Sequence, residues 1–268
     1  MSENVSDLQL TTERPANQKP VGAVVAAIKV LRYLADTPQP VGVSQIAKDT
    51  DLYPSTCFNI LRTLVQEDLV SLDSKAKTYR LGIGIIDFAR GLLANGGLIP
   101  VIQDELYETA QRGGFSMTLW RRMPDHNVVV ASAASGRVEQ ININIGSRLP
   151  TYVGATGRLV AAFERTPRAQ LRNEFKRLRW EDAPEVDEYL RQVELTRARG
   201  WAIDVGNHRA GLITIATPVL DHSERVRMMV AAHMFRDQFT EQQRIEIANR
   251  LQEISERVRR AGSITNYD

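Results

Sequence analysis

Apolar residues between positions 21 and 82 recur first at helical spacing and then in strict alternation. Three helical repeats, within 24–36, 43–50 and 54–67, are followed by two alternating runs on either side of a polar turn at 73–78. Spacings of three and four residues bury one stripe of a helix, and alternation buries one face of a strand. The pattern therefore predicts three helices and a β-hairpin. The inward positions predicted for the first helix are Val24, Ala27, Ile28, Leu31 and Leu34.

The third predicted helix, in the segment DLYPSTCFNILRTL, has an unusual outer face. Pro54 suits the first helical position, where its missing N–H is not needed. The inward stripe consists of Cys57, Ile60, Leu61 and Leu64. The outward positions carry short hydrogen-bonding groups and one guanidinium instead of the usual Glu and Lys: Ser55, Thr56, Asn59 and Arg62. Such a face suits a polar partner, and the pattern alone leaves DNA and protein both open.

Helix, helix, helix and hairpin within about sixty residues is the order of a winged helix-turn-helix, in which the second helix of the pair enters the major groove. Asn59 suits adenine and Arg62 suits guanine, because each can form two hydrogen bonds to a base edge. Ser55 and Thr56, near the helix N-terminus, suit phosphate oxygens. The other candidates for DNA contact are Ser44 and Gln45 in the preceding helix, and Lys75 and Lys77 at the hairpin tip. Ser44 is also expected to cap its helix.

The second half of the chain mixes strand-like and helix-like runs. A helix with a broad apolar face at 83–97 is predicted to connect the halves, and residues 98–268 form the second domain. One strand is predicted at 138–146, where three isoleucines alternate with asparagines. Residues 1–20 are polar and aperiodic, which predicts a flexible arm. The fold class predicted is α+β, with an N-terminal winged helix-turn-helix at 21–82 and a mixed α/β domain.

Composition narrows the class of protein. The chain has 268 residues, of which 43% are hydrophobic and 25% charged, which suits two soluble domains. The net charge is only +2, and residues 21–83 carry seven Lys/Arg against six Asp/Glu, so DNA binding would depend on a local surface and on dimers. A single cysteine, Cys57, excludes an intramolecular disulfide. No apolar run reaches the ~18 residues of a membrane span, so we expect a cytoplasmic protein without a membrane partner.

The sequence offers little for catalysis or for metal binding. The four histidines are scattered, without metal-ligand spacing, so no metal or other cofactor is expected. Neither a Gly-x-Ser-x-Gly motif nor a Walker-type phosphate loop occurs. The glycines of GIGIIDFARG lie in the predicted connecting helix, not after a strand. An enzyme is therefore the least favoured class.

Several segments, in order and correctly spaced, carry a family pattern from about residue 22 to 260. They are VVAAIKVLRYLAD, GVSQIAKDTDLYPSTCFNILRTLVQEDLV, YRLG, IGSRLPTYVGATGRLVAAF, and RARGWAIDVG with GLITIATPVLD. In these segments the chain resembles the isocitrate-lyase-regulator (IclR) family of bacterial transcription factors. The resemblance implies a winged helix that reads an operator, a linker helix, and a GAF-like domain that binds a small effector. Family members act as dimers or tetramers, and often carry basic residues where this chain has Pro54 and Asn59.

The resemblance also implies where the effector would bind. The loop 149–157, which begins at Leu149, would place the backbone N–H groups of Ala155 and Thr156 against an effector carboxylate. A loop of small residues that opens a helix is an anion site on physical grounds as well. The other positions that carry over are Asp204, Thr214, Ala231 and His233.

Two of these positions depart from the family. Relatives often carry small hydroxyl residues where this chain has Ala231 and His233, and a histidine ordinarily titrates near neutrality. We therefore expect an aromatic or otherwise larger organic acid, with Trp120, Phe115 and Met117 supplying an apolar wall. Other readings stay open: His233 and Trp120 as core residues, and Asp204 as the cap of a turn.

Together these features predict a ligand-responsive, DNA-binding transcription regulator and not an enzyme. A homodimer or a dimer of dimers would bind a pseudo-palindromic operator and a small organic effector, and would control a catabolic operon. The alternative is a small-molecule-sensing adaptor whose helical module binds protein instead of DNA.

Overall fold

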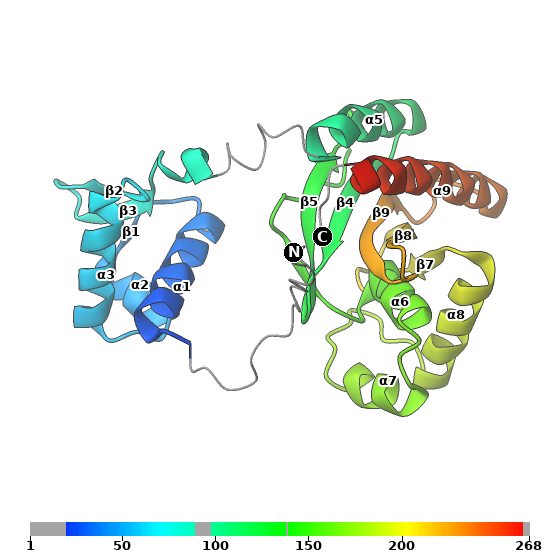
Figure 1. Cartoon of the computed structure of the whole chain (residues 1–268), viewed down its shortest axis with the longest axis horizontal. Helices are drawn as coiled ribbons and strands as arrows, with labels where there is room; N and C mark the ends of the chain where they lie inside the picture. Colours follow the sequence, from blue (N-terminus) through cyan, green and yellow to red (C-terminus); the bar gives the residue numbers. More distant parts are fainter. Residues whose placement is uncertain (1–19, 89–97, 138, 265–268) are drawn as a thin grey trace, which may run out of the picture. The chain divides into compact units, whose positions relative to one another are not determined.

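The chain divides into two compact units, Met1–Leu92 and Leu93–Asp268, each of which is described by itself (Figure 1). The fold is α+β, as predicted: a helical module with a small sheet, and a larger sheet covered by helices. The GAF-like assignment of the second unit stays a prediction. The computed structural model describes residues 20–88, 98–137 and 139–264.

Two predicted segments lie largely outside the described residues. They are the arm at 1–20, of which only Pro20 is described, and the linker helix at 83–97. Residues 83–88 of that linker are described, and 85–88 are helical. The rest of both segments stays a prediction.

The first unit packs three helices against a three-stranded antiparallel sheet (Figure 1). The strand order is β1-β3-β2, so the predicted hairpin β2–β3 gains a third strand. Sequence reasoning missed β1, because two residues cannot show alternation. The elements are α1 (Gly22–Asp36), β1 (Val41–Gly42), α2 (Val43–Asp49), α3 (Pro54–Gln66), β2 (Val70–Asp73) and β3 (Thr78–Leu81).

One apolar core joins these helices. Cys57 and Leu61 of α3 are fully buried, and they share a cluster with Val30 of α1 and Ile46 of α2. The inward stripe predicted for α3 is confirmed, with Ile60 only partly buried. Burying the inner stripe leaves the outer face of α3 open to a partner.

The predicted inner face of α1 is partly wrong. Val24 is 55% exposed and Ile28 is 42% exposed, and both belong to an outer apolar stripe with Val21 and Val25. The helix carries apolar residues on two faces, and periodicity alone does not show which face meets the core. The side chains that α1 buries are Ala26, Val30 and Leu34.

The predicted cap of α2 is also wrong. The helix begins at Val43, and the residue before it, Gly42, makes no side-chain hydrogen bond to the helix. Ser44 therefore lies inside the first turn. The preceding strand β1 fixes the entry of the chain instead, since Gly42 pairs with Thr78 of β3.

The second unit is built around a six-stranded antiparallel sheet of order β6-β5-β4-β9-β8-β7. Helices α5 and α9 cover one face, and α6 covers the other and packs against α8 (Figure 1). The elements are α5 (Leu98–Gly113), β4 (Ser116–Arg122), β5 (His126–Ala133), β6 (Arg148–Pro150), α6 (Gly154–Phe163), α7 (Arg168–Phe175), α8 (Val186–Arg199), β7 (Ala202–Val205), β8 (Leu212–Leu220), β9 (Val226–Phe235) and α9 (Glu241–Ile264).

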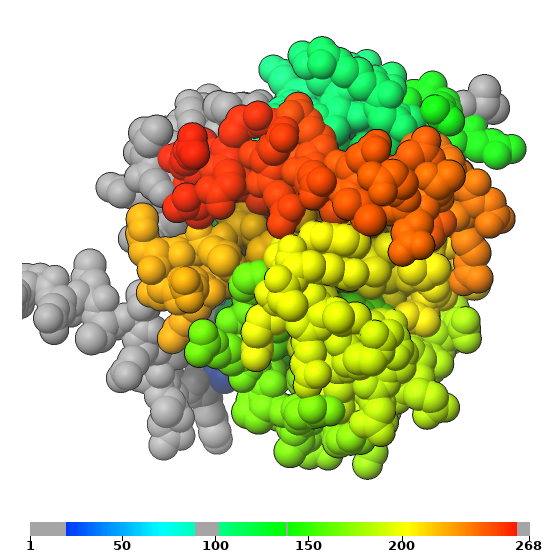
Figure 2. Space-filling model, turned by 90° about the vertical axis from the view of Figure 1, so that its right-hand side faces the viewer, coloured from blue at the N-terminus to red at the C-terminus, as the bar shows by residue number. Residues whose placement is uncertain are grey.

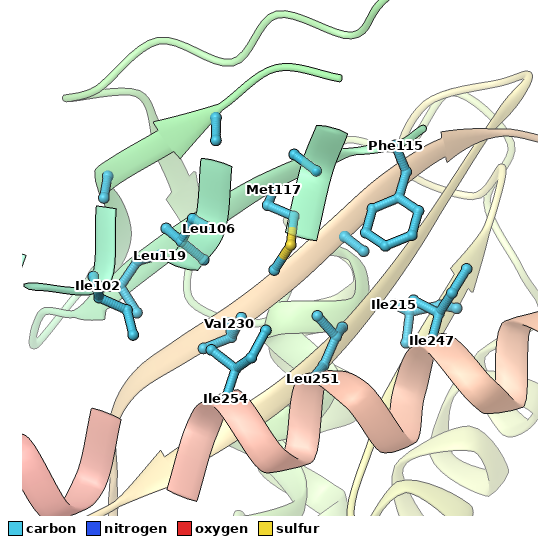
Figure 3. Packing of buried hydrophobic residues seen from close by; sticks show 14 of the residues in the cluster. Ile102, Leu106, Phe115, Met117, Leu119, Ile215, Val230, Ile247, Leu251 and Ile254 are labelled. Carbon is cyan, nitrogen blue, oxygen red and sulfur yellow. The ribbon is translucent and has the colours of Figure 1, made fainter. Parts of the chain in front are cut away.

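The main core lies between the sheet and the helix pair α5 and α9. In Figure 3, Met117 and Leu119 of β4 and Val230 of β9 meet Leu251 and Ile254 of α9. In Figure 2, α9 crosses the surface as a broad band between α5 and α8. This layer is mostly apolar, with one buried hydrogen bond between Thr217 of β8 and Ser255 of α9 (2.7 Å). Phe115 and Met117 belong to it, so the prediction that they form an apolar wall of the effector site is wrong.

The strand predicted at 138–146 is wrong. Residues 140–144 have no regular secondary structure, and the strand of this region is the short β6 that follows. Pairing with β5 begins only where Gly146 donates to the Val129 carbonyl (2.8 Å) and Val129 donates to Ser147 (2.9 Å). The isoleucine alternation has another cause, because Ile143 packs against the cluster beneath α6.

A close backbone approach fixes the start of α6. A Cβ added to Gly157 would lie 2.0 Å from the carbonyl carbon of Tyr152 and 2.4 Å from its oxygen. Only glycine fits there, so the loop that enters α6 can fold back onto the helix.

We expect Gly157→Ala to destabilise the second unit by about 1–3 kcal/mol or more, because the backbone has to move. All three tryptophans of the chain (Trp120, Trp180 and Trp201) lie in this unit, so urea unfolding followed by their fluorescence reports on it alone. The control is Gly211→Asn, where no heavy atom lies within 4 Å of an added Cβ and asparagine tolerates the φ of +78°. Equal stability of the Gly157 variant and the wild type would contradict the close approach.

Candidate functional site

The outer face of α3 presents a stripe of exposed polar side chains. Ser55, Asn59 and Arg62 are exposed, and their spacing of four and three residues places them on one side of the helix. Within the described residues no hydrogen bond or ion pair is recorded for these three side chains. Phe58, which sequence reasoning did not single out, lies in the same stripe and is 48% exposed. Thr56 is exposed beside the stripe.

The turn between β2 and β3 presents Lys75 and Lys77 to solvent. Asp73 organises this turn, since its Oδ1 accepts hydrogen bonds from the N–H groups of Ala76 (3.0 Å) and Lys75 (2.9 Å). These two bonds hold the pKa of Asp73 below its usual value. The tip is thus a closed turn that carries two ammonium groups.

Helix α2 contributes the two remaining candidates for DNA contact, Ser44 and Gln45, both exposed. Gln45 donates from Nε2 to the carboxylate of Asp49 (2.8 and 2.9 Å), which also accepts a hydrogen bond from Tyr33 (2.7 Å). Gln45 is therefore engaged within its own helix. All eight candidates for DNA contact lie on the surface of the first unit.

A cavity of about 500 Å³ opens in the second unit between the sheet and the start of α6. This volume is typical of small-molecule sites. Seven of the eight candidates for effector contact line it: Trp120, Leu149, Ala155, Thr156, Asp204, Thr214 and His233. Sequence reasoning missed several further lining residues: Ile141, Ile143, Arg148, His208, Arg209 and Leu212.

Ala231 is the candidate that does not line the cavity. It is fully buried and lies opposite Thr118 in the β4–β9 register. Its methyl group belongs to the cluster beneath α6. A side chain this small leaves room for the ring of His233, the next residue on the same face, to reach Thr118.

Helix α6 begins at the cavity wall with N–H groups that lack helical partners. The first helical bond runs from the N–H of Gly157 to the carbonyl of Val153 (3.0 Å). The N–H groups of Gly154, Ala155 and Thr156 precede it and have no partner within the helix. Together with the positive end of the helix dipole they favour an anion.

Asp204 is not an isolated carboxylate. Its Oδ1 lies 2.7 Å from Nη1 of Arg158, which is fully buried in α6, and its Oδ2 accepts a hydrogen bond from the N–H of His208 (3.0 Å). Arg158 also donates to Gln192 (2.7 Å) and Asn207 (2.8 Å). The ion pair neutralises the only acidic side chain that lines the cavity. It also joins α6, β7 and the loop after β7.

His233 lies between two threonines. Its Nε2 is 2.7 Å from the hydroxyl of Thr118, and its Nδ1 is 3.1 Å from that of Thr214. Burial lowers the pKa of His233 from 6.5 to about 3, so the expectation that it titrates near neutrality is wrong. Burial disfavours the charged imidazole, and the ring is neutral at physiological pH.

Two cations and a second histidine also line the cavity. Arg148 and Arg209 line it, and Arg209 forms an exposed ion pair with Glu181 (2.5 Å). The Nδ1 atom of His208 is buried and has no hydrogen-bond partner among the described atoms. Burial is the main reason why the pKa of His208 is lowered. A ligand that reaches this nitrogen would satisfy it.

Both units match known family models. Residues 92–260 match the family model described as "Bacterial transcriptional regulator IclR C-terminal", and residues 23–74 match the "IclR helix-turn-helix domain". The chain belongs to the IclR family. It is therefore a DNA-binding transcription regulator with a C-terminal effector-binding domain, and not an enzyme.

Individual IclR-family proteins agree with this assignment. The HTH-type transcriptional repressor AllR of Escherichia coli K12 is 23% identical over 210 residues, which cover 77% of this chain and 78% of AllR. The IclR transcriptional regulator from Alicyclobacillus acidocaldarius is 25% identical, with a TM-score of 0.81 over 91% of this chain and 99% of that one. An IclR homologue from Microbacterium hydrocarbonoxydans, solved in complex with 4-hydroxybenzoate, shares the fold at 16% identity, with a TM-score of 0.71 over 89% and 99% of the chains.

None of the helices in the described part of the chain combines the length and the apolar character that a membrane-spanning helix needs. In the same part of the chain, no group of three or more His, Cys, Asp or Glu side chains could hold a metal ion.

We expect His233 to make the second unit less stable in mild acid. The unfolded histidine binds a proton below its ordinary pKa of 6.5, whereas the folded one stays neutral down to about pH 3. Stability therefore falls as the pH drops, by about 2 kcal/mol between pH 7 and pH 5. Urea unfolding followed by tryptophan fluorescence at both pH values should show this loss in the wild type, and less of it in His233→Gln. Equal losses in both proteins would show that the ring can ionise in the folded state.

Proposed function

We propose that this regulator binds a pseudo-palindromic operator as a homodimer or a dimer of dimers, and that an organic anion in the cavity changes its DNA binding. Helix α3 of each subunit enters the major groove. The protein acts in the cytoplasm, where the bacterial chromosome lies, and controls a catabolic operon close to its own gene.

The unpaired stripe on α3 carries the DNA-binding part of the proposal. Asn59 and Arg62 are exposed, and their side chains form no hydrogen bond or ion pair with residues 20–88, so both can meet base edges without losing one of those contacts. An asparagine that reads adenine and an arginine that reads guanine each contribute ~1–3 kcal/mol of discrimination. Ser55 and Thr56 at the start of the helix and the lysines of the β2–β3 turn suit phosphate oxygens.

The outer stripe of α1 supports self-association. Val21, Val24, Val25 and Ile28 are between 39% and 68% exposed and repeat at helical spacing. A second copy of the same helix would remove these side chains from water, which is favourable by about 25 cal/mol for each Å² of apolar surface buried. A dimer also doubles the number of base contacts, which suits a DNA-binding unit with little net charge.

The cavity carries the effector part of the proposal. Its polar lining offers N–H donors at the start of α6 and the cations Arg148 and Arg209, while Asp204 is neutralised by Arg158. Trp120, Leu149 and other apolar side chains line the rest. This combination suits an organic acid with an apolar body. An aromatic acid such as 4-hydroxybenzoate, the compound bound by the Microbacterium relative, has both parts and is the first compound to test.

Exposed aromatic side chains favour one alternative, an adaptor whose helical module binds protein. Tyr53 is 82% exposed just before α3, and Phe58 is 48% exposed on it. Aromatic side chains are common at the centres of protein interfaces. Membership of a DNA-binding family favours DNA, and the following two experiments separate the partners.

We expect Asn59→Ala and Arg62→Ala each to weaken specific DNA binding about tenfold or more, because each removes two hydrogen bonds to a base edge. Fluorescence anisotropy with the DNA upstream of the regulator's own gene measures the affinity, with unrelated DNA as competitor. The control is Arg112→Ala, which removes an exposed arginine from the second unit. Unchanged affinity of both α3 variants, or no sequence-selective complex, would favour the adaptor.

We expect Phe58 to contact a thymine methyl group, since an apolar side chain in a reading stripe meets the one apolar group of the major groove. The operator is first located by footprinting. Replacing each operator thymine by uracil should then weaken binding at one position in each half-site, by about threefold or more. In Phe58→Ala that same replacement should have no effect. Sensitivity to uracil that persists in the variant would show that Phe58 does not read the methyl group.

A further inference from the structure

Four side chains on the cavity face of the sheet form one continuous hydrogen-bond chain, here called the relay. Nε1 of Trp120 lies 2.7 Å from Oγ1 of Thr118, which in turn lies 2.7 Å from Nε2 of His233. Nδ1 of His233 lies 3.1 Å from Oγ1 of Thr214. Thr118 is fully buried, whereas Thr214 is half-buried and lines the cavity. The relay thus runs from the core to the cavity wall.

The relay crosses three neighbouring strands. His233 on β9 lies directly opposite Thr214 on β8, and on its other side the ring reaches Thr118 on β4 across the diagonal. Because both hydroxyls are held by strands that also carry the core, their separation from the ring is fixed. With these distances given, the open question is which atom of each pair donates the proton.

The indole of Trp120, at the buried end, determines the direction of the first hydrogen bond. Its N–H can only donate, so Thr118 must accept from Trp120. Among the described residues, His233 is the only other hydrogen-bond partner recorded for the Thr118 hydroxyl. If Nε2 of His233 donated as well, Thr118 would accept twice, and its own proton would be buried without an acceptor. That arrangement carries the cost of a buried unsatisfied donor, about 1–3 kcal/mol.

The favoured arrangement has the Thr118 hydroxyl donating to a bare Nε2. The ring is neutral, because burial lowers the pKa of His233 to about 3. A neutral imidazole carries one proton, which must then be on Nδ1. Nδ1 donates it to Oγ1 of Thr214, and Thr214 is left with a hydroxyl proton that its partner in the relay does not use.

We propose that the relay has one direction, from Trp120 through Thr118 and His233 to Thr214, and that the hydroxyl of Thr214 is a fixed hydrogen-bond donor to the effector. The proposal rests on the function proposed for the cavity. It makes His233, Thr118 and Trp120 positioning residues, because they set the direction in which the Thr214 hydroxyl donates.

A fixed donor at this wall selects the chemistry of the ligand. The atom that meets Thr214 must be an acceptor, such as a carboxylate, carbonyl or phenolate oxygen. An ammonium or amide N–H at that place would face a donor and leave both groups unpaired. Together with the N–H groups at the start of α6, the Thr214 hydroxyl places hydrogen-bond donors at two separate walls of the cavity.

The decisive measurement is the tautomer of His233 in the ligand-free protein. A long-range ¹H–¹⁵N correlation spectrum separates a protonated from a bare ring nitrogen, and the signal is assigned by its loss in His233→Gln. We expect Nδ1 protonated and Nε2 bare, without change between pH 8 and pH 5. A ring protonated on Nε2, or on both nitrogens, would overturn the proposal.

Trp120→Phe tests the cause of the direction. The variant keeps an aromatic ring but loses the N–H, so Thr118 becomes free to accept from His233. We expect the two nitrogen signals to move towards each other as both tautomers become populated. An unchanged tautomer would show that Trp120 does not set the direction. If this variant fails to fold, the wild-type spectrum still decides the direction itself.

Thr214 is tested with 4-hydroxybenzoate as the probe, by isothermal titration calorimetry. We expect Thr214→Val to weaken binding about tenfold or more, since a hydrogen bond to a charged acceptor is lost, whereas Thr214→Ser stays within about threefold of the wild type. Wild-type affinity in Thr214→Val would overturn the assignment of this hydroxyl as donor. If the wild type does not bind 4-hydroxybenzoate, the effector proposed for the cavity fails for that compound, and the tautomer still decides the relay.

Discussion

The two-sided sheet of the second unit is the constraint on which its other features depend. Successive side chains of a strand point to opposite faces, so each strand has to satisfy two environments at once. On β9, Val230, Ala232 and Met234 pack beneath α5 and α9, and the residues between them face α6. The first face is mainly apolar and packs against two helices. On the second face α6 leaves a cavity, so polar side chains of the same strands can meet a ligand there.

A buried ion pair complements this arrangement on the side of α6. Arg158 brings a charge into the interior, where an unpaired guanidinium would be strongly disfavoured. Asp204 on β7, Gln192 on α8 and Asn207 each accept one of its hydrogen bonds, and the rings of Trp180 and Tyr189 lie over it at 5.8 and 5.4 Å. The pair therefore holds the helix that opens at the cavity in register with the edge of the sheet. Its removal would loosen the cavity wall and the loop that carries His208 together.

Much of the fold could be predicted from the sequence, because its helices and strands have strong periodicity. The order of the three helices and the hairpin in the first unit follows from that signal, as does the buried stripe of α3. The isoleucines at 141–145 led to the wrong prediction of a strand. Alternation shows that successive side chains lie in two different environments, but it does not show whether a neighbouring strand is present to pair with. The outer valines of α1 misled it for a related reason, because a helix with two apolar faces does not reveal which one meets the core.

The candidate site was harder to predict than the fold. The loop at the start of α6 could be recognised, because small residues before a helix have a local physical meaning. Arg158 could not, since an arginine in an amphipathic helix is normally taken for a surface residue, and its partners are 34 to 49 positions away. The neutral state of His233 depends on burial by strands distant in sequence, and the exposure of Phe58 depends on which face of α3 packs inward.

The alternation of β8 and β9 also bears on how such a regulator can evolve. Thr214 and His233 face the cavity, while their immediate neighbours Ile213, Ile215, Ala232 and Met234 face the opposite core. A mutation at a cavity position therefore changes ligand preference without disturbing the packing that keeps the unit folded. In each strand, one set of alternate residues keeps the unit folded and the other set faces the ligand cavity. Single substitutions on the cavity face can therefore produce regulators that respond to different effectors.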